Sequence, residues 1–167
     1  MGAAAMTTIV DPTPAAESFQ AALESGQIER DSLTQCKTDP GYFLHFDNAG
    51  GKPRLTFVQL DGTKVMAHLQ AVVVEPIDGV PCFQIGYAVP VAYRKQGLAL
   101  KIVEATIAEL KNMAALAGGS AFYVEAIVGV DNEASNRVAT KMLSSPMSIT
   151  DKPSGSAAFR YEKKVDL

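Results

Sequence analysis

Apolar residues recur along this chain of 167 residues with spacings that change from one segment to the next. Near the N-terminus, Phe19, Ala22 and Leu23 recur at helical spacing, which predicts an amphipathic helix over residues 15–26. A weaker helical pattern follows over residues 30–37. The next segments are instead rich in strand-forming residues, and we predict strands over residues 42–46, 55–60, 64–74 and 82–89.

Short turns join three of these predicted strands. Asp61-Gly62 and Asp78-Gly79 separate consecutive strands, and both residues of such a pair tolerate the positive φ of a tight hairpin turn. Strands joined in this way pair antiparallel, so the sequence predicts an antiparallel meander.

The second half of the chain predicts a crossover between parallel strands. From about Gly97, apolar residues repeat at spacings of three and four until Gly118, which indicates a long helix. Residues 121–128 form a near-continuous apolar run, typical of a strand inside a sheet covered on both faces. A strand, a helix and a strand in this order predict a right-handed parallel crossover. A helix over residues 132–143 and a final strand over residues 158–165 complete a mixed α/β sheet.

The composition fits one folded domain. Hydrophobic residues make up 47% of the chain and charged residues 20%, as expected for a protein that buries a core. Fifteen basic and eighteen acidic residues give a net charge of -3, so no basic field attracts nucleic acid or anionic lipid. The first residues lack the basic segment of a signal peptide, and we expect a cytoplasmic protein, either a monomer or a homodimer. The domain is expected to cover residues 6–167, with residues 1–5 a remnant of cloning if Met6 is the native start.

The two cysteines, Cys36 and Cys82, are too few for a disulfide framework and lack the paired spacing of a zinc site. We therefore expect two reduced, buried thiols and no metal.

The segment from Tyr87 to Ala99 places a tight loop between a predicted strand and the long helix. Backbone N–H groups and the positive end of the helix dipole converge at such a junction and can bind an anion. Gly97 has no side chain that would obstruct a phosphate, and Arg94 and Lys95 add positive charge.

At this loop the sequence resembles the GCN5-related N-acetyltransferase (GNAT) family, whose diphosphate loop reads Arg or Gln, x, x, Gly, x, Gly or Ala. Here Arg94-Lys-Gln-Gly97-Leu-Ala99 fits that pattern. A second segment, Asn132-Glu-Ala-Ser135, is similar to the Asn-x-x-Ser helix of ribosomal-protein N-terminal acetyltransferase relatives. The resemblance implies a GNAT fold with splayed central strands and acetyl-CoA as the acyl donor. It implies cofactor contacts from Tyr87, Ala88, Val89, Arg94, Lys95, Gln96, Gly97, Leu98, Ala99, Asn132 and Ser135.

The activity that the resemblance implies is direct transfer of an acetyl group from acetyl-CoA to a primary amine, on a small molecule, a protein N-terminus or a lysine. An amine must lose a proton before it attacks. We predict Glu125 as the proton acceptor, because an acidic residue is uncommon in an apolar strand; a structural salt bridge or a solvated strand end is the alternative. Glu75, which is expected at a turn, is the next candidate. The backbone N–H of Val89 is the expected donor to the oxyanion. Tyr87 and Tyr93 are expected to pack rather than to act as acids.

The general acid of many family members is missing from this chain. They carry a tyrosine seven residues after the Asn, whereas position 139 is Ala. We therefore predict that Ser135 or an ordered water protonates the CoA sulfur, or that no acid is needed. The alternative function is a catalytically inactive acyl-CoA sensor or interaction module, and Asn132 could serve only as a helix cap. We expect residues 26–30 and 151–156 to form the acceptor site.

Overall fold

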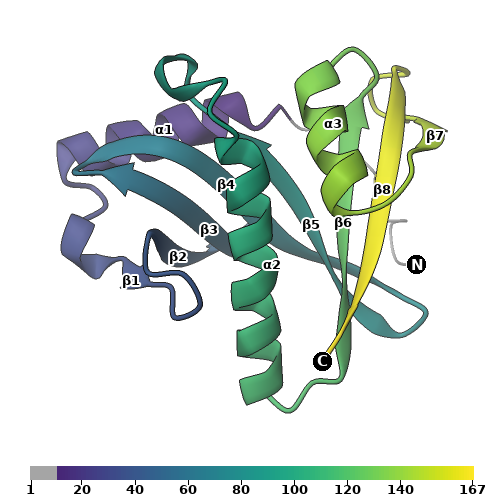
Figure 1. Cartoon of the computed structure of the whole chain (residues 1–167), viewed down its shortest axis with the longest axis horizontal. Coiled ribbons are helices and arrows are strands. Elements are labelled where there is room, and N and C mark those ends of the chain that lie inside the picture. Colours follow the sequence, from purple (N-terminus) through teal and green to yellow (C-terminus); the bar gives the residue numbers. More distant parts are fainter. Residues whose placement is uncertain (1–10) are drawn as a thin grey trace.

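The structure is a computed structural model that describes residues 11–167. These residues form one eight-stranded sheet with helices on both faces (Figure 1). The predicted domain start at residue 6 and the remnant over residues 1–5 lie outside the described residues. The strands are β1 (Thr34–Gln35), β2 (Tyr42–Ala49), β3 (Lys52–Asp61), β4 (Lys64–Ile77), β5 (Val80–Ala88), β6 (Ala121–Gly129), β7 (Met147–Thr150) and β8 (Ala157–Asp166). The helices are α1 (Thr13–Ser25), α2 (Leu98–Leu116) and α3 (Glu133–Met142), with short 3-10 turns η1 (Arg30–Ser32) and η2 (Val91–Tyr93).

The sheet has the strand order β1-β2-β3-β4-β5-β6-β8-β7, and it confirms the predicted mixed α/β class. Strands β1 to β5 form an antiparallel meander. Its hairpin turns have positive φ at Gly62, Asp78 and Gly79, as the Asp-Gly pairs predict. The helix predicted over residues 15–26 corresponds to α1, and the long helix from about Gly97 corresponds to α2.

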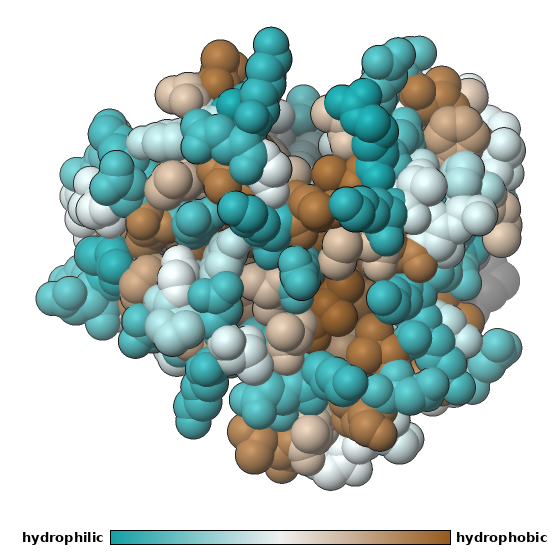
Figure 2. Space-filling model, viewed as in Figure 1, coloured by the Kyte–Doolittle hydropathy of each residue, from teal (hydrophilic) through white to brown (hydrophobic). Residues whose placement is uncertain are grey.

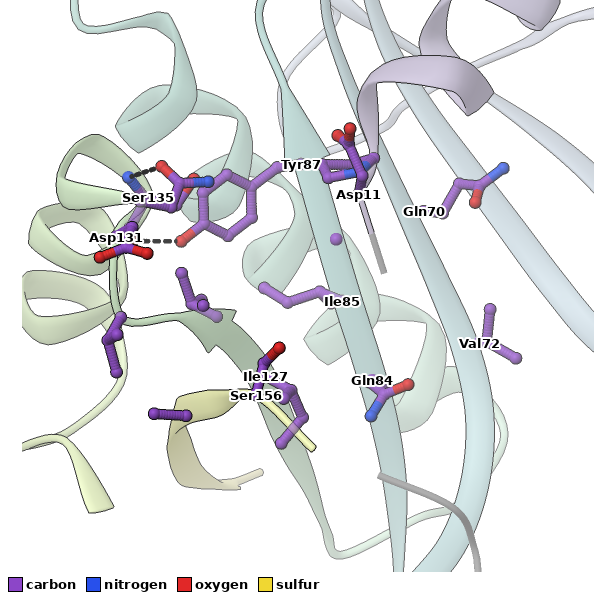
Figure 3. Close-up of a pocket in the computed structure, with 17 residues that line it drawn as sticks. Asp11, Gln70, Val72, Gln84, Ile85, Tyr87, Ile127, Asp131, Ser135 and Ser156 are labelled. Atoms are coloured by element: carbon purple, nitrogen blue, oxygen red, sulfur yellow. Dashed lines mark hydrogen bonds between the residues drawn. The ribbon is translucent and has the colours of Figure 1, made fainter. Parts of the chain in front are cut away.

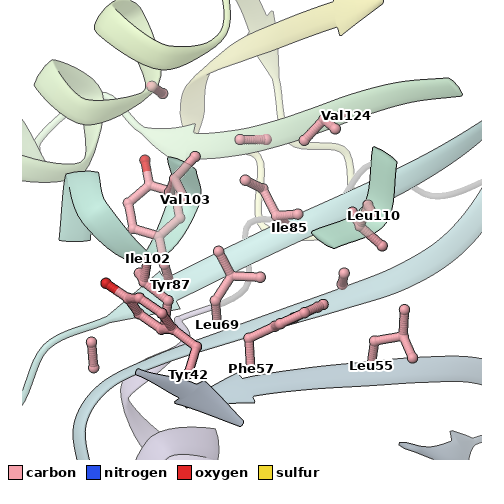
Figure 4. Close-up of a cluster of buried hydrophobic side chains, with 14 of the residues drawn as sticks. Tyr42, Leu55, Phe57, Leu69, Ile85, Tyr87, Ile102, Val103, Leu110 and Val124 are labelled. Carbon is pink, nitrogen blue, oxygen red and sulfur yellow. The ribbon is translucent and has the colours of Figure 1, made fainter. Parts of the chain in front are cut away.

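Each face of the sheet buries one set of alternating side chains. On the face that we call the α2 face, Leu69 and Ile85 pack with Ile102 and Val103 of α2 in the main core, which also includes Tyr87 (Figure 4). On the opposite α1 face, Phe19 and Leu23 of α1 cover Val58 and Val65. The ring of His68 also lies against Phe19, and burial lowers the pKa of this histidine to about 4. From Ala67 onward, alternation along β4 and β5 decides which residues can face each helix. Val65 lies beyond a register shift in the pairing of β3 with β4, so it faces α1 instead.

The prediction of a helix over residues 30–37 is wrong. A single 3-10 turn, η1, is followed by strand β1, which pairs with β2. The backbone N–H groups of Lys37 and Thr38 donate to the carboxylate of Glu109 on α2, so they are not available for helical bonds. The sequence pattern also failed to predict the four-residue edge strand β7.

The crossover β5-α2-β6 brings β5 and β6 together in parallel, as predicted. Only three residue pairs join them, Cys82 with Tyr123, Phe83 with Val124 and Gln84 with Glu125. Beyond these pairs β5 continues to Ala88 and β6 to Gly129. The two central strands therefore diverge toward their carboxyl ends, which confirms the splayed arrangement.

None of the helices within residues 11–167 combines the length and the apolar character needed to cross a bilayer.

Glu109 fastens the segment before β2 to α2, and this anchor can be tested by mutation. Glu109 is 5% exposed, and its carboxylate accepts hydrogen bonds from Lys37 N, Thr38 N and Thr38 Oγ1. We expect Glu109→Ala to lower the free energy of unfolding by about 2 kcal/mol, because three donors lose a charged acceptor. Urea denaturation measures the change. Glu104→Ala, an exposed position on the same helix, is the matched control and should change it by less than about 0.5 kcal/mol.

The same anchor predicts a pH dependence. Burial acts to raise the pKa of Glu109, but the hydrogen bonds from Thr38 and Lys37 outweigh it and hold the pKa below its ordinary value of 4.5. The stabilisation is therefore present above pH 4.5 and disappears as the pH falls through the lower pKa of the folded state. The difference between the wild type and Glu109→Ala should shrink at acid pH. A difference that stays constant, or equal losses for Glu104→Ala and Glu109→Ala, would contradict this account.

Candidate active site

A cavity of about 390 Å³ opens where β5 and β6 diverge (Figure 3). Its walls come from β4, β5 and β6, from Asp11 and Pro12 at the start of α1, and from Asn132 and Ser135 at the start of α3. Gln70 and Gly86 are paired across β4 and β5, as are Val72 and Gln84. These four residues lie on the α1 face, because they alternate with Leu69, Ile85 and Tyr87 of the main core. Ile85, Tyr87 and Val128 of the main core also line the cavity, so it opens on the α1 face and extends into the slot between the strands.

The loop predicted to bind an anion follows directly after β5, at the open end of the divergence. The Arg94 side chain folds back, and its Nε donates to the carbonyl oxygen of Val89 at 2.9 Å. Lys95 and Gly97 both have positive φ, 65° and 74°. Residues 94–97 are exposed, whereas Leu98 is buried in the core. The turn is thus open to solvent and is held in shape by its own backbone.

The first turn of α2 has free N–H groups. Within residues 11–167, no side chain caps this helix, and its first backbone bond runs from Lys101 N to the Gly97 carbonyl oxygen at 3.2 Å. The N–H groups of Leu98, Ala99 and Leu100 precede that bond and have no helical partner. A side chain built at Gly97 would enter open space. An anion can therefore approach these N–H groups and the positive end of the helix dipole.

The start of α3 differs, because its N–H groups are capped. Ser135 N donates to Asn132 Oδ1 at 3.2 Å, so the predicted capping role of Asn132 is confirmed. Asn136 Nδ2 donates to the Gly129 carbonyl oxygen at 3.0 Å, and the Tyr161 hydroxyl donates to Asn136 Oδ1 at 2.7 Å. These bonds fasten α3 to β6 and β8. A cofactor contact of Asn132 stays a prediction.

Tyr87 bridges the divergence between β5 and α3. Its hydroxyl donates to the Ser135 carbonyl oxygen at 2.7 Å, and its ring belongs to the main core (Figure 3). Burial raises the pKa of the Tyr87 phenol above its ordinary value, so the hydroxyl keeps its proton. The predicted packing role of Tyr87 agrees with this environment, and its hydroxyl also lies at the cavity wall.

Glu125 is buried on β6 and makes three polar contacts. Arg160 of β8 donates Nε to Glu125 Oε2 at 2.9 Å, and its Nη2 lies 2.7 Å from the same oxygen. Gln84 Nε2 donates to Glu125 Oε1 at 3.1 Å. The salt bridge considered from the sequence therefore exists, and the carboxylate lies behind Gln84, which lines the cavity. Whether Glu125 also accepts a proton from an amine stays a prediction.

The predicted acceptor segments have different positions. Ser156, at the end of residues 151–156, lines the cavity. Residues 26–30 lie elsewhere: Arg30 Nε donates to the carbonyl oxygen of Gly62 at the β3–β4 turn, and its guanidinium lies 3.9 Å from the centre of the Phe43 ring. No residue of 26–30 is among the described residues that line the cavity.

Sequence reasoning missed Gln70, Gln84 and Asp11 as lining residues. Gln84 and Gln70 carried no motif, and only the strand register shows that they face the same cavity.

The remaining polar candidates are structural. Cys36 and Cys82 are both buried and free, as predicted, and burial raises the pKa of each thiol to about 12. Nowhere in residues 11–167 do three His, Cys, Asp or Glu side chains gather as a metal site requires.

The cap on α3 gives a prediction for Asn132. We expect Asn132→Ala to reduce the free energy of unfolding by about 1 kcal/mol, because Ser135 N loses its acceptor. Asn132→Asp, which keeps an oxygen at the same place, should retain most of the stability. Thermal denaturation of the three proteins tests this, and equal destabilisation by Ala and Asp would show that the cap contributes nothing.

Comparison with known proteins agrees with this geometry. A model of the acetyltransferase (GNAT) family matches residues 24–143. Among solved structures, the NatC complex bound to Gag peptide and CoA is similar in fold, with 17% identity, a TM-score of 0.51 and coverage of 66% of this chain and 70% of that chain. RimL, a ribosomal L7/L12 α-N-protein acetyltransferase in complex with coenzyme A, has 20% identity and a TM-score of 0.48 over 68% of this chain.

A ribosomal-protein-S5-alanine acetyltransferase from Vibrio fischeri has 14% identity and a TM-score of 0.49 over 67% of this chain. The match spans 63% of the RimL chain and 61% of the Vibrio fischeri chain, less than two thirds of either. No curated protein sequence matches. Because the family model covers well over half of the sequence, this chain belongs to the GNAT acetyltransferase family.

Proposed function

We propose that this protein is an acetyl-CoA-dependent N-acetyltransferase that transfers an acetyl group to a primary amine by direct attack. The acceptor is a small molecule, a protein N-terminus or a lysine side chain. One observation supports this most strongly: the uncapped start of α2 follows directly from the open end of the divergence between β5 and β6. An anion-binding turn beside a slot between strands suits a long thioester that ends in a diphosphate.

In this proposal the N–H groups at Gly97, Leu98 and Ala99 bind the diphosphate, and Arg94, Lys95 and Gln96 surround it. The pantetheine arm runs along Tyr87, Ala88 and Val89 into the slot, past Asn132 and Ser135 of α3. Apolar surface gathers along the middle of the α2 face, between α2 and α3, as Figure 2 shows in the view of Figure 1. That surface suits the less polar part of the cofactor.

The proposed reaction forms one C–N bond and breaks one C–S bond. The neutral amine attacks the thioester carbonyl carbon, and the Val89 N–H stabilises the oxygen that becomes negative. The bond from Arg94 to the Val89 carbonyl restrains the end of β5, which supports that role. The intermediate then expels the CoA thiolate, and the extra proton on the nitrogen is passed through Ser135 or a water molecule to the thiolate sulfur.

Two protons need partners in this scheme. Glu125 is the proposed acceptor for the amine proton, which reaches it past Gln84 through a water molecule. Ser135 or a water molecule protonates the CoA sulfur. A thiol with an ordinary pKa near 8.5 is a tolerable leaving group, so a strong acid is not required.

A second function is favoured by one specific position. Ala139 is 1% exposed and packs in the main core, so it provides no hydroxyl where many family members have a tyrosine. A protein that binds acyl-CoA without turnover, as a sensor or an interaction module, fits that observation. Release of CoA in the presence of amines distinguishes the two functions, since binding without release favours the module.

The two free thiols support a reducing compartment, and we place the protein in the cytoplasm in this proposal. The proposed domain extends over residues 6–167.

Gly97→Glu tests the diphosphate site. We expect it to abolish detectable acetyl-CoA binding in calorimetry, because the added side chain brings bulk and negative charge to the N–H groups of α2. Gly118→Glu is a matched control at the other end of the same helix: its φ of 77° and open surroundings are similar, and it adds the same charge. Equal affinity in Gly97→Glu and wild type would rule out this site.

Glu125→Gln tests the proposed proton acceptor. The variant should lose about 100-fold in kcat at neutral pH, the usual size of a general-base contribution. Its rate should recover as the pH rises toward the pKa of the amine, near 10, because the free amine then needs no base. A pH-rate profile identical to that of the wild type would exclude Glu125 from the mechanism.

A further inference from the structure

The cavity on the α1 face is the side from which an acceptor reaches the thioester, if the proposed function holds. The start of α2 and the apolar surface beside it belong to the α2 face, whereas Gln70, Val72, Gln84 and Gly86 line the cavity from the α1 face. A cofactor arm that enters the slot from α2 exposes its acetyl group to this cavity. The residues here therefore select the acceptor.

Negative charge dominates this cavity. Asp11 and Asp131 stand at its rim, and no Lys, Arg or His occurs among the described residues that line it. The nearby cation, Arg160, is already shared between two carboxylates, those of Glu125 at 2.7 Å and Glu162 at 2.6 Å. Two carboxylates at the rim, Asp11 and Asp131, thus add to a buried group in which two carboxylates share one guanidinium. Such a field attracts cations and disfavours a carboxylate on the acceptor.

Gln84 presents a hydrogen-bond acceptor to the cavity, and Glu125 fixes its orientation. Gln84 Nε2 donates to Glu125 Oε1 at 3.1 Å, so the NH₂ group of the Gln84 amide is turned toward Glu125. Gln84 lines the cavity (Figure 3), and its amide oxygen is not used in the bond to Glu125. An ammonium or amine nitrogen is the complementary ligand, because it has N–H groups to donate.

The same cavity has apolar walls between its polar groups. Val72, Ile85, Ile127 and Val128 line it. These side chains suit the methylene groups of an alkyl chain better than the polar backbone of a peptide.

We infer that the acceptor is a small alkyl amine with a second positive charge and no carboxylate, in the chemical class of the diamines. The Gln84 oxygen binds the nitrogen that is acetylated, and the carboxylates at the rim bind the distal ammonium. This inference rests on the proposed function and narrows its acceptor.

Three probes of equal chain length test the inference with the full chain and acetyl-CoA: 1,4-diaminobutane, n-butylamine and 4-aminobutanoate. They differ only in the far end, which is cationic, neutral or anionic. We expect kcat/KM for 1,4-diaminobutane to exceed that for 4-aminobutanoate at least about tenfold, with n-butylamine between them. Equal values, a preference for 4-aminobutanoate, or a peptide N-terminus that outperforms the diamine would overturn the inference.

Substitutions test which residues cause the preference for the diamine. Asp131→Asn should reduce the preference for the diamine over n-butylamine about threefold, as expected for an exposed charge. Asp78→Asn makes the same charge change in the distant β4–β5 turn and should leave the preference unchanged. Gln84→Met should raise KM for all amines several-fold with a smaller change in kcat, and its thermal denaturation shows whether it is folded. A loss of preference that is equal in Asp131→Asn and Asp78→Asn would contradict a local site.

The failure of the inference can be separated from that of the proposed function. If any amine releases CoA, the proposed function stands and the ranking of the three probes decides the inference. If no amine releases CoA, the binding of the same three probes to the CoA-loaded protein is measured by calorimetry. Tighter binding of 1,4-diaminobutane than of the other two supports the inference, and equal binding of all three rejects it.

Discussion

The parallel pairing of β5 and β6 stops after Gln84 and Glu125, and the site depends on that interruption. In a continuous sheet the next residues of both strands would bond to each other, and the backbone between them would be closed to any ligand. Here the Tyr87 hydroxyl spans the opening to the Ser135 carbonyl oxygen, while Asn136 holds α3 to the end of β6. The opening is therefore supported by side chains and leaves strand edges free for a bound molecule.

The opening also separates two regions of opposite electrostatic character. On one side, the uncapped N–H groups of α2 and the exposed Arg94 and Lys95 favour an anion. On the other side, the carboxylates around Gln84 favour a cation. In the proposed function, an anionic donor and a cationic acceptor approach from opposite faces of the same sheet and meet where the strands diverge. Arg160 offsets the charge of the buried Glu125, but it is shared with Glu162, so carboxylates remain in excess on the side of Gln84.

The regular elements were predictable because their signals are local. Asp-Gly pairs specify the two hairpins, helical spacing specifies α2, and Asn132 specifies the start of α3. The open turn before α2 was also predictable, because a glycine and two cations stand at a strand-to-helix junction. The rest depends on partners far apart in sequence. Arg160 lies 35 residues after its partner Glu125. Glu109 accepts hydrogen bonds from the backbone of residues 37 and 38, more than 70 residues earlier, and these bonds replace the helix predicted there. Neither the short edge strands nor the role of Gln84 has a sequence signal, since pairing and register create them.

The most direct test of the account is an amide NMR titration of the protein with acetyl-CoA. The account predicts large shift changes for the backbone N–H groups of Gly97, Leu98 and Ala99, together with Tyr87 and Val128 on the two strands that face each other across the slot. Binding that shifts other residues and leaves these amides unchanged, or no shift at millimolar cofactor, would contradict it.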